Sequence, residues 1–225
     1  MRRSGVKLLY PHVDNKRIVN SMPESLAVVI LAGGRSTRMR MDKAFIRFQG
    51  QTFLELIYNE MSRISQRILV LVGNKDTKKF KNVLGPNASV INDSFPIGTP
   101  VGGMLTASSV LSEDYIGFIA CDLPFVRSEL ILKLYHIAKG HSAAIPRWEN
   151  GGLEPLCAVY RREEVEHAAH AALHRGMVSC KDVISLLNDV VYVDVEDARS
   201  VDPELRSFLN INSRRELSNL MAGLK

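Results

Sequence analysis

The stretch that most constrains this chain is residues 26–43, which read Leu-Ala-Val-Val-Ile-Leu-Ala-Gly-Gly-Arg-Ser-Thr-Arg-Met-Arg-Met-Asp-Lys. Its first six residues are apolar and rich in β-branched side chains, which is typical of a strand buried in a parallel sheet. Ala32, Gly33 and Gly34 follow, and their small side chains let backbone N–H groups approach an anion closely. Cations come next, at Arg35, Arg38, Arg40 and Lys43. The stretch therefore predicts a phosphate-binding loop at the carboxyl end of a first strand.

The loop matches neither of the two common phosphate-binding patterns, G-x-G-x-x-G and G-x-x-x-x-G-K-[ST]. Gly33-Gly34 taken alone is explained equally well by a tight turn followed by solvated arginines. The wider sequence must therefore decide between a turn and a ligand site.

Composition limits the classes of protein that this chain can belong to. With 225 residues, 46% hydrophobic and 24% charged, it suits one α/β domain with an ample core. A net charge of +5 fits a polyanionic small molecule, whereas 7% aromatic residues without aromatic–basic interleaving argue against a nucleic-acid partner. Three cysteines without a C-x-x-C pair indicate a reducing compartment and no zinc site, so we expect a cytoplasmic protein. No apolar run approaches the length of a membrane span.

The first 25 residues differ from the rest of the chain. They are rich in Lys and Arg, contain two prolines and lack the apolar core of a secretory signal. We interpret residues 1–25 as an N-terminal extension and residues 26–225 as the domain. Met22 lies just before the first strand and is an alternative translation start.

Short apolar runs alternate with helical patterns along the domain. Strands are expected at 68–72, 90–91, 116–120, 143–146 and 190–195, and Thr52 with Glu55 forms a capping-box pattern for a helix that continues to about residue 64. A second such pattern, Ser213 with Glu216, predicts a C-terminal helix. This alternation predicts an α/β fold with a doubly wound, mostly parallel, Rossmann-like sheet.

Polar residues follow three of these strands, where ligands bind in such folds. Asn74 and Asp93 are each also explained as ordinary loop residues, Asp93 through an Asx-turn. Asp122 is followed by Pro124, which leaves one carboxylate at the sheet rim as a candidate Mg²⁺ ligand. The competing explanation for Asp122 is a cap on the helix that begins near Ser128. We also expect Asp93 to lie near enough to Asp122 for mutual repulsion.

Two further features are ambiguous. Trp148 precedes a glycine-rich turn and is a hairpin tip, a core plug or a platform for a flat ligand. A predicted helix places His167, His170 and His174 on one face, which we expect to be solvated rather than metal-binding.

Several of these motifs occur together in one known family. Ala-Gly-Gly, Arg-Met and Asp-Lys in this order, the Pro-x-x-Gly-like loop after Asp93, Asp122-x-Pro, Pro-Leu-x-Ala-Val-Tyr at 155–160 and Asn210-x-Asn212 resemble the molybdenum cofactor guanylyltransferases, a group of nucleotidyltransferases. The resemblance covers about residues 26–217. Arg40 departs from it, because the family usually has Gly after the Arg-Met pair; a position that needs positive φ would strain Arg40.

The resemblance implies transfer of GMP from GTP to the phosphate of molybdopterin, with Mg²⁺ as cofactor and pyrophosphate released. It implies molybdoenzymes or their chaperones as further partners. It assigns nucleotide binding to Leu31, Ala32, Gly33, Gly34, Lys43, Asn74, Asp93 and Asp122; acceptor binding to Gly103, Glu154, Asn210 and Asn212; catalysis to Arg38, Lys43 and Asp122; and the metal to Asp122.

Two alternatives stay open on the sequence alone. A related enzyme on the same scaffold would use CTP or another small phosphorylated acceptor, and a panel of NTPs distinguishes it. A non-catalytic GTP-binding or delivery protein would bind GTP without releasing pyrophosphate.

Overall fold

A seven-stranded sheet forms the centre of the computed structural model, which describes residues 22–34, 42–95, 98–211 and 216. The strands, two of which form a separate small hairpin, are β1 (Leu26–Leu31), β2 (Arg47–Phe48), β3 (Gln51–Thr52), β4 (Ile68–Leu71), β5 (Ser89–Ile91), β6 (Tyr115–Ala120), β7 (Ala143–Arg147), β8 (Cys157–Arg161) and β9 (Val190–Asp194). The α-helices are α1 (Phe53–Met61), α2 (Thr77–Leu84), α3 (Pro100–Val110), α4 (Ser128–Ala138), α5 (Arg162–His174) and α6 (Cys180–Ser185). Short 3₁₀ turns are η1 (Lys43–Phe45), η2 (Val195–Ser200) and η3 (Arg206–Phe208).

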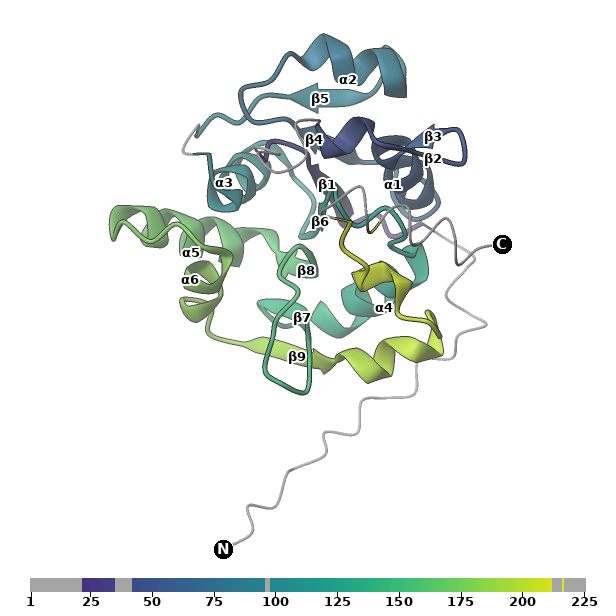
Figure 1. Cartoon of the computed structure of the whole chain (residues 1–225). Helices are drawn as coiled ribbons and strands as arrows, with labels where there is room; N and C mark the ends of the chain where they lie inside the picture. The colour runs from purple at the N-terminus through teal and green to yellow at the C-terminus, as the bar shows by residue number, and fades with distance from the viewer. Residues whose placement is uncertain (1–21, 35–41, 96–97, 212–215, 217–225) are drawn as a thin grey trace, which may run out of the picture.

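The strand order β5-β4-β1-β6-β8-β7-β9 confirms the predicted doubly wound, mostly parallel sheet (Figure 1). β1 pairs in parallel with β4 and β6, and β4 with β5, while β8 runs antiparallel to both β6 and β7. Four neighbouring strands therefore end at the same edge, and the loops that follow them come together there.

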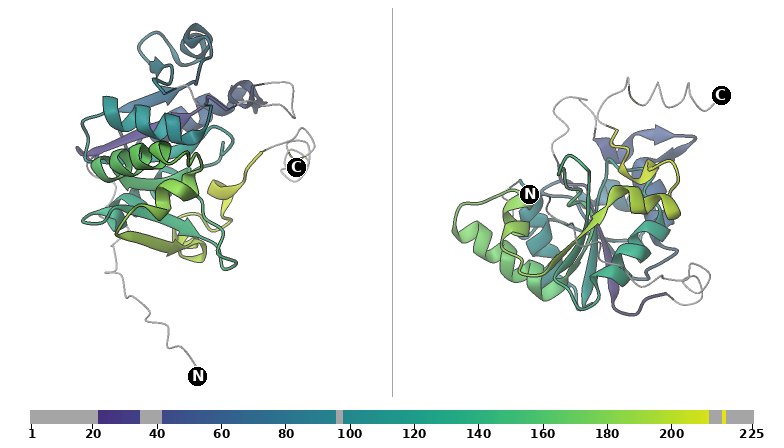
Figure 2. Two further views of the ribbon diagram at one scale, coloured as in Figure 1. Left: turned by 90° about the vertical axis from the view of Figure 1, so that its left-hand side faces the viewer. Right: turned by 90° about the horizontal axis from the view of Figure 1, so that it is seen from below.

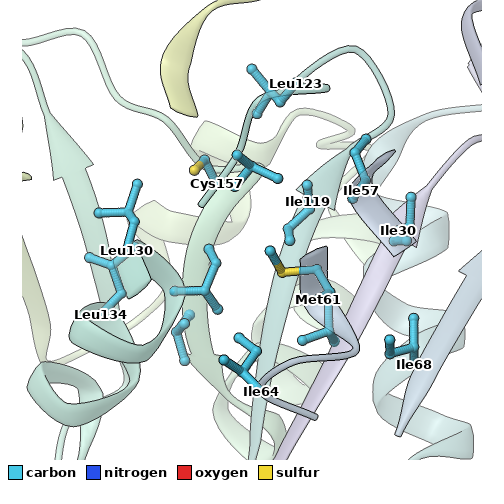
Figure 3. Close-up of a cluster of buried hydrophobic side chains, with 14 of the residues drawn as sticks. Ile30, Ile57, Met61, Ile64, Ile68, Ile119, Leu123, Leu130, Leu134 and Cys157 are labelled. Carbon is cyan, nitrogen blue, oxygen red and sulfur yellow. The ribbon is translucent and has the colours of Figure 1, made fainter. Parts of the chain in front are cut away.

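Alternate residues of the sheet face two different helical layers, which lie on opposite sides of it (Figure 2). On one side, Ile30 and Ile119 pack with Ile57 and Met61 of α1 and with side chains of α4 (Figure 3). On the other side, Val29 belongs to the cluster formed with α3, α5 and α6. Every strand of the centre is thus covered on both faces, which explains its continuous apolar sequence.

Helix α3 is the most enclosed helix of the described chain, with eight buried residues from Val101 to Ser108. It is apolar all round because it lies between the sheet and α5, its main helical neighbour. This burial fixes the start of α3, at Thr99-Pro100, against the edge where the strands end.

The capping box predicted for the start of α1 is confirmed. Thr52 accepts a hydrogen bond from the Glu55 N–H at 3.1 Å, and Glu55 accepts one from the Thr52 N–H at 2.7 Å. The helix that they start ends at Met61, not near residue 64. Most of the predicted C-terminal helix and residues 1–21 of the extension lie outside the described residues. Within the described part of the chain, no helix has the length and apolar character to span a membrane.

Candidate nucleotide-binding and catalytic site

The loops after β1, β4, β5 and β6 enclose a cavity of about 260 Å³ at the carboxyl edge of the sheet. Strand order places Asp93, Gly73, Gly33 and Asp122 in sequence along this edge. The cavity is lined by Leu31, Gly33, Gly34, Lys43, Leu71, Gly73, Asn74, Asp93, Gly98, Thr99, Pro100, Gly103, Ala120, Cys121, Asp122 and Leu156. Eight residues predicted from the sequence therefore line one cavity.

Gly33 is required by a close approach of two loops. A Cβ at this position would lie 2.7 Å from the Gly73 nitrogen and 2.9 Å from its Cα. Gly73 has φ +64°, a left-handed conformation that favours glycine. The β1 and β4 loops therefore touch through their backbones, whereas a Cβ at Gly34 would meet nothing within 4 Å.

Asp93 joins the β5 loop to the same pair. Its N–H donates to the Gly73 carbonyl at 3.0 Å, and its Oδ1 accepts from the Gly73 N–H at 3.1 Å. Its Oδ2 is oriented toward Gly103, where a Cβ would lie 3.8 Å away. Burial raises the pKa of Asp93, although the Gly73 hydrogen bond opposes this. Asp93 therefore links the β5 loop to the β4 loop instead of forming the Asx-turn considered above. This link orients the Asp93 carboxylate at the cavity wall.

Lys43 and Asp122 bring opposite charges to one side of the cavity. Lys43 Nζ lies 2.7 Å from Asp122 Oδ2, and the two side chains are only 19% and 17% exposed. Asp122 Oδ1 is buried without a hydrogen-bond partner in the described structure. Because a buried anionic oxygen without a partner is costly, this atom is suited to a ligand that supplies positive charge.

The structure rules out the competing explanation for Asp122 and one expectation about its surroundings. It does not cap α4, because the Ser128 N–H donates instead to Glu60 Oε1 at 2.9 Å. Asp93 does not lie close to it, because β4 and β1 separate the two strand ends, roughly 14 Å at the usual strand spacing. The charged group in direct contact with Asp122 is Lys43.

Cys121 also lines the cavity, beside these charges. Burial, with smaller effects from Asp122 and Asp42, raises the pKa of its thiol to about 12. The side chain therefore stays a neutral thiol and is not suited to act as a nucleophile or thiolate ligand.

Glu154 lies beyond the cavity wall, on the side of Leu156. Its Oε1 accepts a hydrogen bond from Trp148 Nε1 at 2.7 Å, and the Trp148 ring packs edge-on against Phe208 with centroids 5.7 Å apart. Burial raises the pKa of Glu154, and the negative charge of Asp122 adds to this, while the Trp148 bond opposes it. Trp148 is thus half-buried and orients Glu154.

The Asn210-x-Asn212 motif approaches Asp122 through its central residue. The Ile211 N–H donates to the Asp122 carbonyl at 3.0 Å, and the Ile211 side chain is buried among Ile46, Phe48 and Phe53. Asn210 is exposed beside this anchor. Residues 210 and 211 are therefore held at the edge of the sheet where Asp122 lies.

The remaining predicted residues are placed as follows. Gly103 lies next to Leu31 and Asp93, on the side predicted for the nucleotide rather than beside Glu154. Ala32 adjoins the cavity without lining it, and Arg38 and Asn212 lie outside the described residues, as does Arg40. The histidines of α5 are exposed, and no group of three or more His, Cys, Asp or Glu within the described ranges could hold a metal.

Sequence reasoning missed Lys75 and Thr99. Lys75 follows Asn74 and contacts the end of β1. Thr99 lines the cavity with a buried Oγ1 that has no hydrogen-bond partner in the described part. The signal for Thr99 was present, since a residue before a proline at a helix start is an N-cap.

A model of the MobA-like NTP transferase domain matches residues 28–195, which include every strand end of this site. The chain belongs to this family. This confirms the resemblance found in the sequence, and the family's nucleotidyltransferase activity agrees with a glycine-lined cavity that contains a lysine and a carboxylate.

Named relatives give the same result. The chain is 35% identical over 206 residues to a protein named probable molybdenum cofactor guanylyltransferase from Methanosarcina mazei, covering 88% of this chain and 91% of the relative. It is 30% identical to the molybdenum cofactor guanylyltransferase of Desulfosudis oleivorans, covering 90% and 97%. The structure of molybdopterin-guanine dinucleotide biosynthesis protein A from Archaeoglobus fulgidus superposes with a TM-score of 0.75 at 25% identity, covering 88% and 100%.

Proposed function

We propose that this protein transfers GMP from GTP to the phosphate of molybdopterin and releases pyrophosphate. The observation that carries the proposal is the Lys43–Asp122 pair at the wall of a glycine-lined cavity, with Asp122 Oδ1 buried and unpartnered in the described structure. The names of the relatives at 30–35% identity support GTP and molybdopterin as the substrates.

The triphosphate would occupy the β1 side of the cavity. Backbone N–H groups of the glycine loop and the Lys43 ammonium supply the positive groups that an anionic chain of phosphates requires. A phosphate oxygen of the acceptor is already ionised, so its attack on the α-phosphorus needs alignment and charge neutralisation rather than a strong base. The described site accordingly contains a cation and a carboxylate.

Asp122 fits a divalent cation such as Mg²⁺. Mg²⁺ takes hard oxygen ligands, typically one or two carboxylates together with phosphate oxygens and water. Asp122 offers one carboxylate with an unpartnered oxygen, which such an ion could take as a ligand beside the phosphates. When bound, the ion would neutralise charge on the phosphates. Lys43 would then exchange Asp122 for a phosphate oxygen.

Base selection is assigned to the β5 side of the cavity. Asp93 Oδ1 is occupied by Gly73, which leaves Oδ2, facing Gly103, to accept from the N–H donors on the edge of guanine. Adenine does not present two donors on that edge. Asn74 lines the same region from the β4 loop and adds an amide.

The acceptor would lie on the side of Glu154 and Asn210. A pterin ring carries an N–H and an amino donor on one edge, and Glu154 is a half-buried carboxylate with one oxygen fixed by Trp148. Asn210 is exposed next to the Ile211 anchor on Asp122. The charge of Asp122 acts on Glu154, and Asn210 adjoins the residue that bonds to the Asp122 backbone, which supports an acceptor position near Asp122 rather than near Asp93.

Pyrophosphate release tests this function directly. The protein is incubated with each of the four NTPs, with and without molybdopterin, in Mg²⁺ and then in excess EDTA. We expect release only with GTP, molybdopterin and Mg²⁺ together. Equal release with CTP would indicate a related cytidylyltransferase, and GTP binding without release would indicate a non-catalytic protein.

A further inference from the structure

Lys75 makes two contacts that the reaction scheme does not use. Its Nζ donates to the Ala32 carbonyl at 2.6 Å and lies 2.7 Å from Asp42 Oδ2. The Lys75 and Asp42 side chains are 24% and 22% exposed, and neither lines the cavity formed by the described residues. The pair therefore lies behind the site rather than in it.

The two partners of Lys75 flank residues 33–41, the predicted phosphate-binding loop. Ala32 comes directly before Gly33-Gly34, and Asp42 comes directly before Lys43. Asp42 also accepts from the Ala44 N–H through Oδ1, at 3.3 Å, and so starts the turn η1 that carries Lys43. One ammonium group thus connects the beginning of the loop to the residue that precedes Lys43.

The backbone of Lys75 is held in place by two hydrogen bonds. Its N–H donates to the Val72 carbonyl at 3.1 Å, and its own carbonyl accepts from Asn92 Nδ2 at 2.7 Å. The ammonium also lies 5.9 Å from the centre of the Phe80 ring. Lys75 is therefore a fixed point on the β4 loop from which the β1 loop is positioned.

We propose that Lys75 is a positioning residue for nucleotidyl transfer, which acts through Asp42 and Ala32 to fix where Lys43 meets the triphosphate. The proposal rests on the proposed function. Lys43 reaches Asp122 at 2.7 Å only if η1 is correctly placed, and a displacement of about 1 Å in a catalytic group lowers the rate strongly. Because the pair is mostly buried, its loss should also lower stability somewhat, as for the Lys43–Asp122 pair, but the loss specific to positioning should appear in turnover.

The test compares Lys75→Met, which keeps the apolar stem and removes the charge, with Lys79→Met, an exposed lysine on α2. We expect Lys75→Met to lower kcat by about 10- to 100-fold, with KM for GTP within about threefold of wild type and only a small fall in melting temperature. Lys75→Arg should recover most of the lost kcat, because it restores charge and donors. Lys79→Met should match wild type.

A second variant tests the route of the effect. Asp42→Asn should lower kcat in the same way, and the Asp42→Asn/Lys75→Met double variant should be no slower than the worse single variant, because both remove one connection. Wild-type kcat in Lys75→Met, a rise in KM instead of a fall in kcat, or additive losses in the double variant would each overturn the proposal.

Hydrogen exchange provides a measurement that needs no turnover. Amides at 32–34 and 42–46 should exchange faster in Lys75→Met than in Lys79→Met, and equal exchange would reject the positioning role. A wild-type protein that releases no pyrophosphate would reject the proposed function instead, so the two failures are distinguishable.

Discussion

The loops after β1 and β4 meet through their backbones, whereas the segments around Trp148 and Phe208 meet through side chains. On the side proposed for the nucleotide, Gly33 contacts Gly73 directly, and Gly73 exchanges two hydrogen bonds with Asp93, one with its backbone N–H and one with its carboxylate. On the side proposed for the acceptor, Trp148 packs on Phe208 and donates to Glu154. The glycine contact depends on missing side chains, whereas the contacts of Trp148 and of the Asp93 carboxylate depend on specific ones.

This difference suits what each side is proposed to recognise. A triphosphate is bound by N–H groups in a fixed backbone frame, which few substitutions can reproduce. An acceptor molecule is distinguished by contacts with side chains. These side chains can be substituted without changing the backbone that binds the triphosphate. Asp122 connects the two sides, because its carboxylate faces Lys43 while its carbonyl accepts from Ile211.

The largest effect is expected where the two sides join. Asp122→Asn keeps the shape but removes the anionic ligand, and we expect a loss of about 3–5 kcal/mol of transition-state stabilisation, about 10²- to 10⁴-fold in kcat. Pyrophosphate release with GTP, Mg²⁺ and molybdopterin measures it. The partly buried pair with Lys43 is lost too, so a small fall in melting temperature accompanies it.

Asp114→Asn is the matched control, because Asp114 is an exposed aspartate just before β6, at the opposite end of the same strand. It should keep wild-type turnover. Near-wild-type turnover in Asp122→Asn would contradict the metal-ligand assignment.

On the nucleotide side, Asp93→Ala should reduce selection of GTP over ATP by about 10²-fold, because unpaired guanine donors would cost binding free energy. Asp93→Asn separates the two roles of this carboxylate. Its amide oxygen can still accept from Gly73, but it no longer offers two acceptors, so the variant should keep the fold and lose selectivity. Competition between GTP and ATP in the same assay measures the ratio. Unchanged selectivity in both variants would mean that Asp93 links the loops but does not select the base.

Alanine substitutions at two neighbouring glycines test the backbone contact between the β1 and β4 loops. Gly33→Ala places a Cβ 2.7 Å from the Gly73 nitrogen, so the loops must separate, and we expect about 1–3 kcal/mol of destabilisation. Gly34→Ala has open space and should leave the stability nearly unchanged. Chemical denaturation of both variants measures the difference. Equal stabilities would mean that the β1 and β4 loops are not in contact in solution.

The sequence predicted several of the residues that line the cavity because they come just after strands. Asn74, Asp93 and Asp122 could be assigned to one edge once the strands were taken as parallel. Their geometry was less accessible. Strand order separates Asp93 from Asp122, and no local pattern specifies that order, so the expected repulsion between them was wrong.

The acceptor side was less predictable because its contacts join distant parts of the chain. Trp148 and Phe208 are 60 residues apart in the sequence, and Ile211 bonds to Asp122, which lies 89 residues earlier. Lys75 was missed for a similar reason, since a lysine after a strand looks like any solvated loop residue. Its contact with Ala32 depends on β1 and β4 being neighbours.

The smallest expected effect concerns Glu154 and is a change in stability with pH. Burial and the charge of Asp122 raise its pKa above the usual 4.5, so the folded protein binds this proton more tightly than the unfolded chain does. Stability contributed by Glu154 is therefore lost as the pH rises from about this usual value through the raised folded pKa. Glu154→Gln does not titrate, and its amide oxygen can still accept from Trp148.

The melting temperature of Glu154→Gln, measured relative to wild type without substrates, should accordingly increase as the pH rises through that window and then level off. Glu149→Gln removes an exposed carboxylate from the same loop and serves as the control for net charge. In the same variant, KM for molybdopterin should rise while KM for GTP stays, because Glu154 lies on the side of the cavity away from Asp93. A melting-temperature difference that does not change with pH would contradict the raised pKa, and a parallel rise in KM for GTP would contradict the division of the site into two sides.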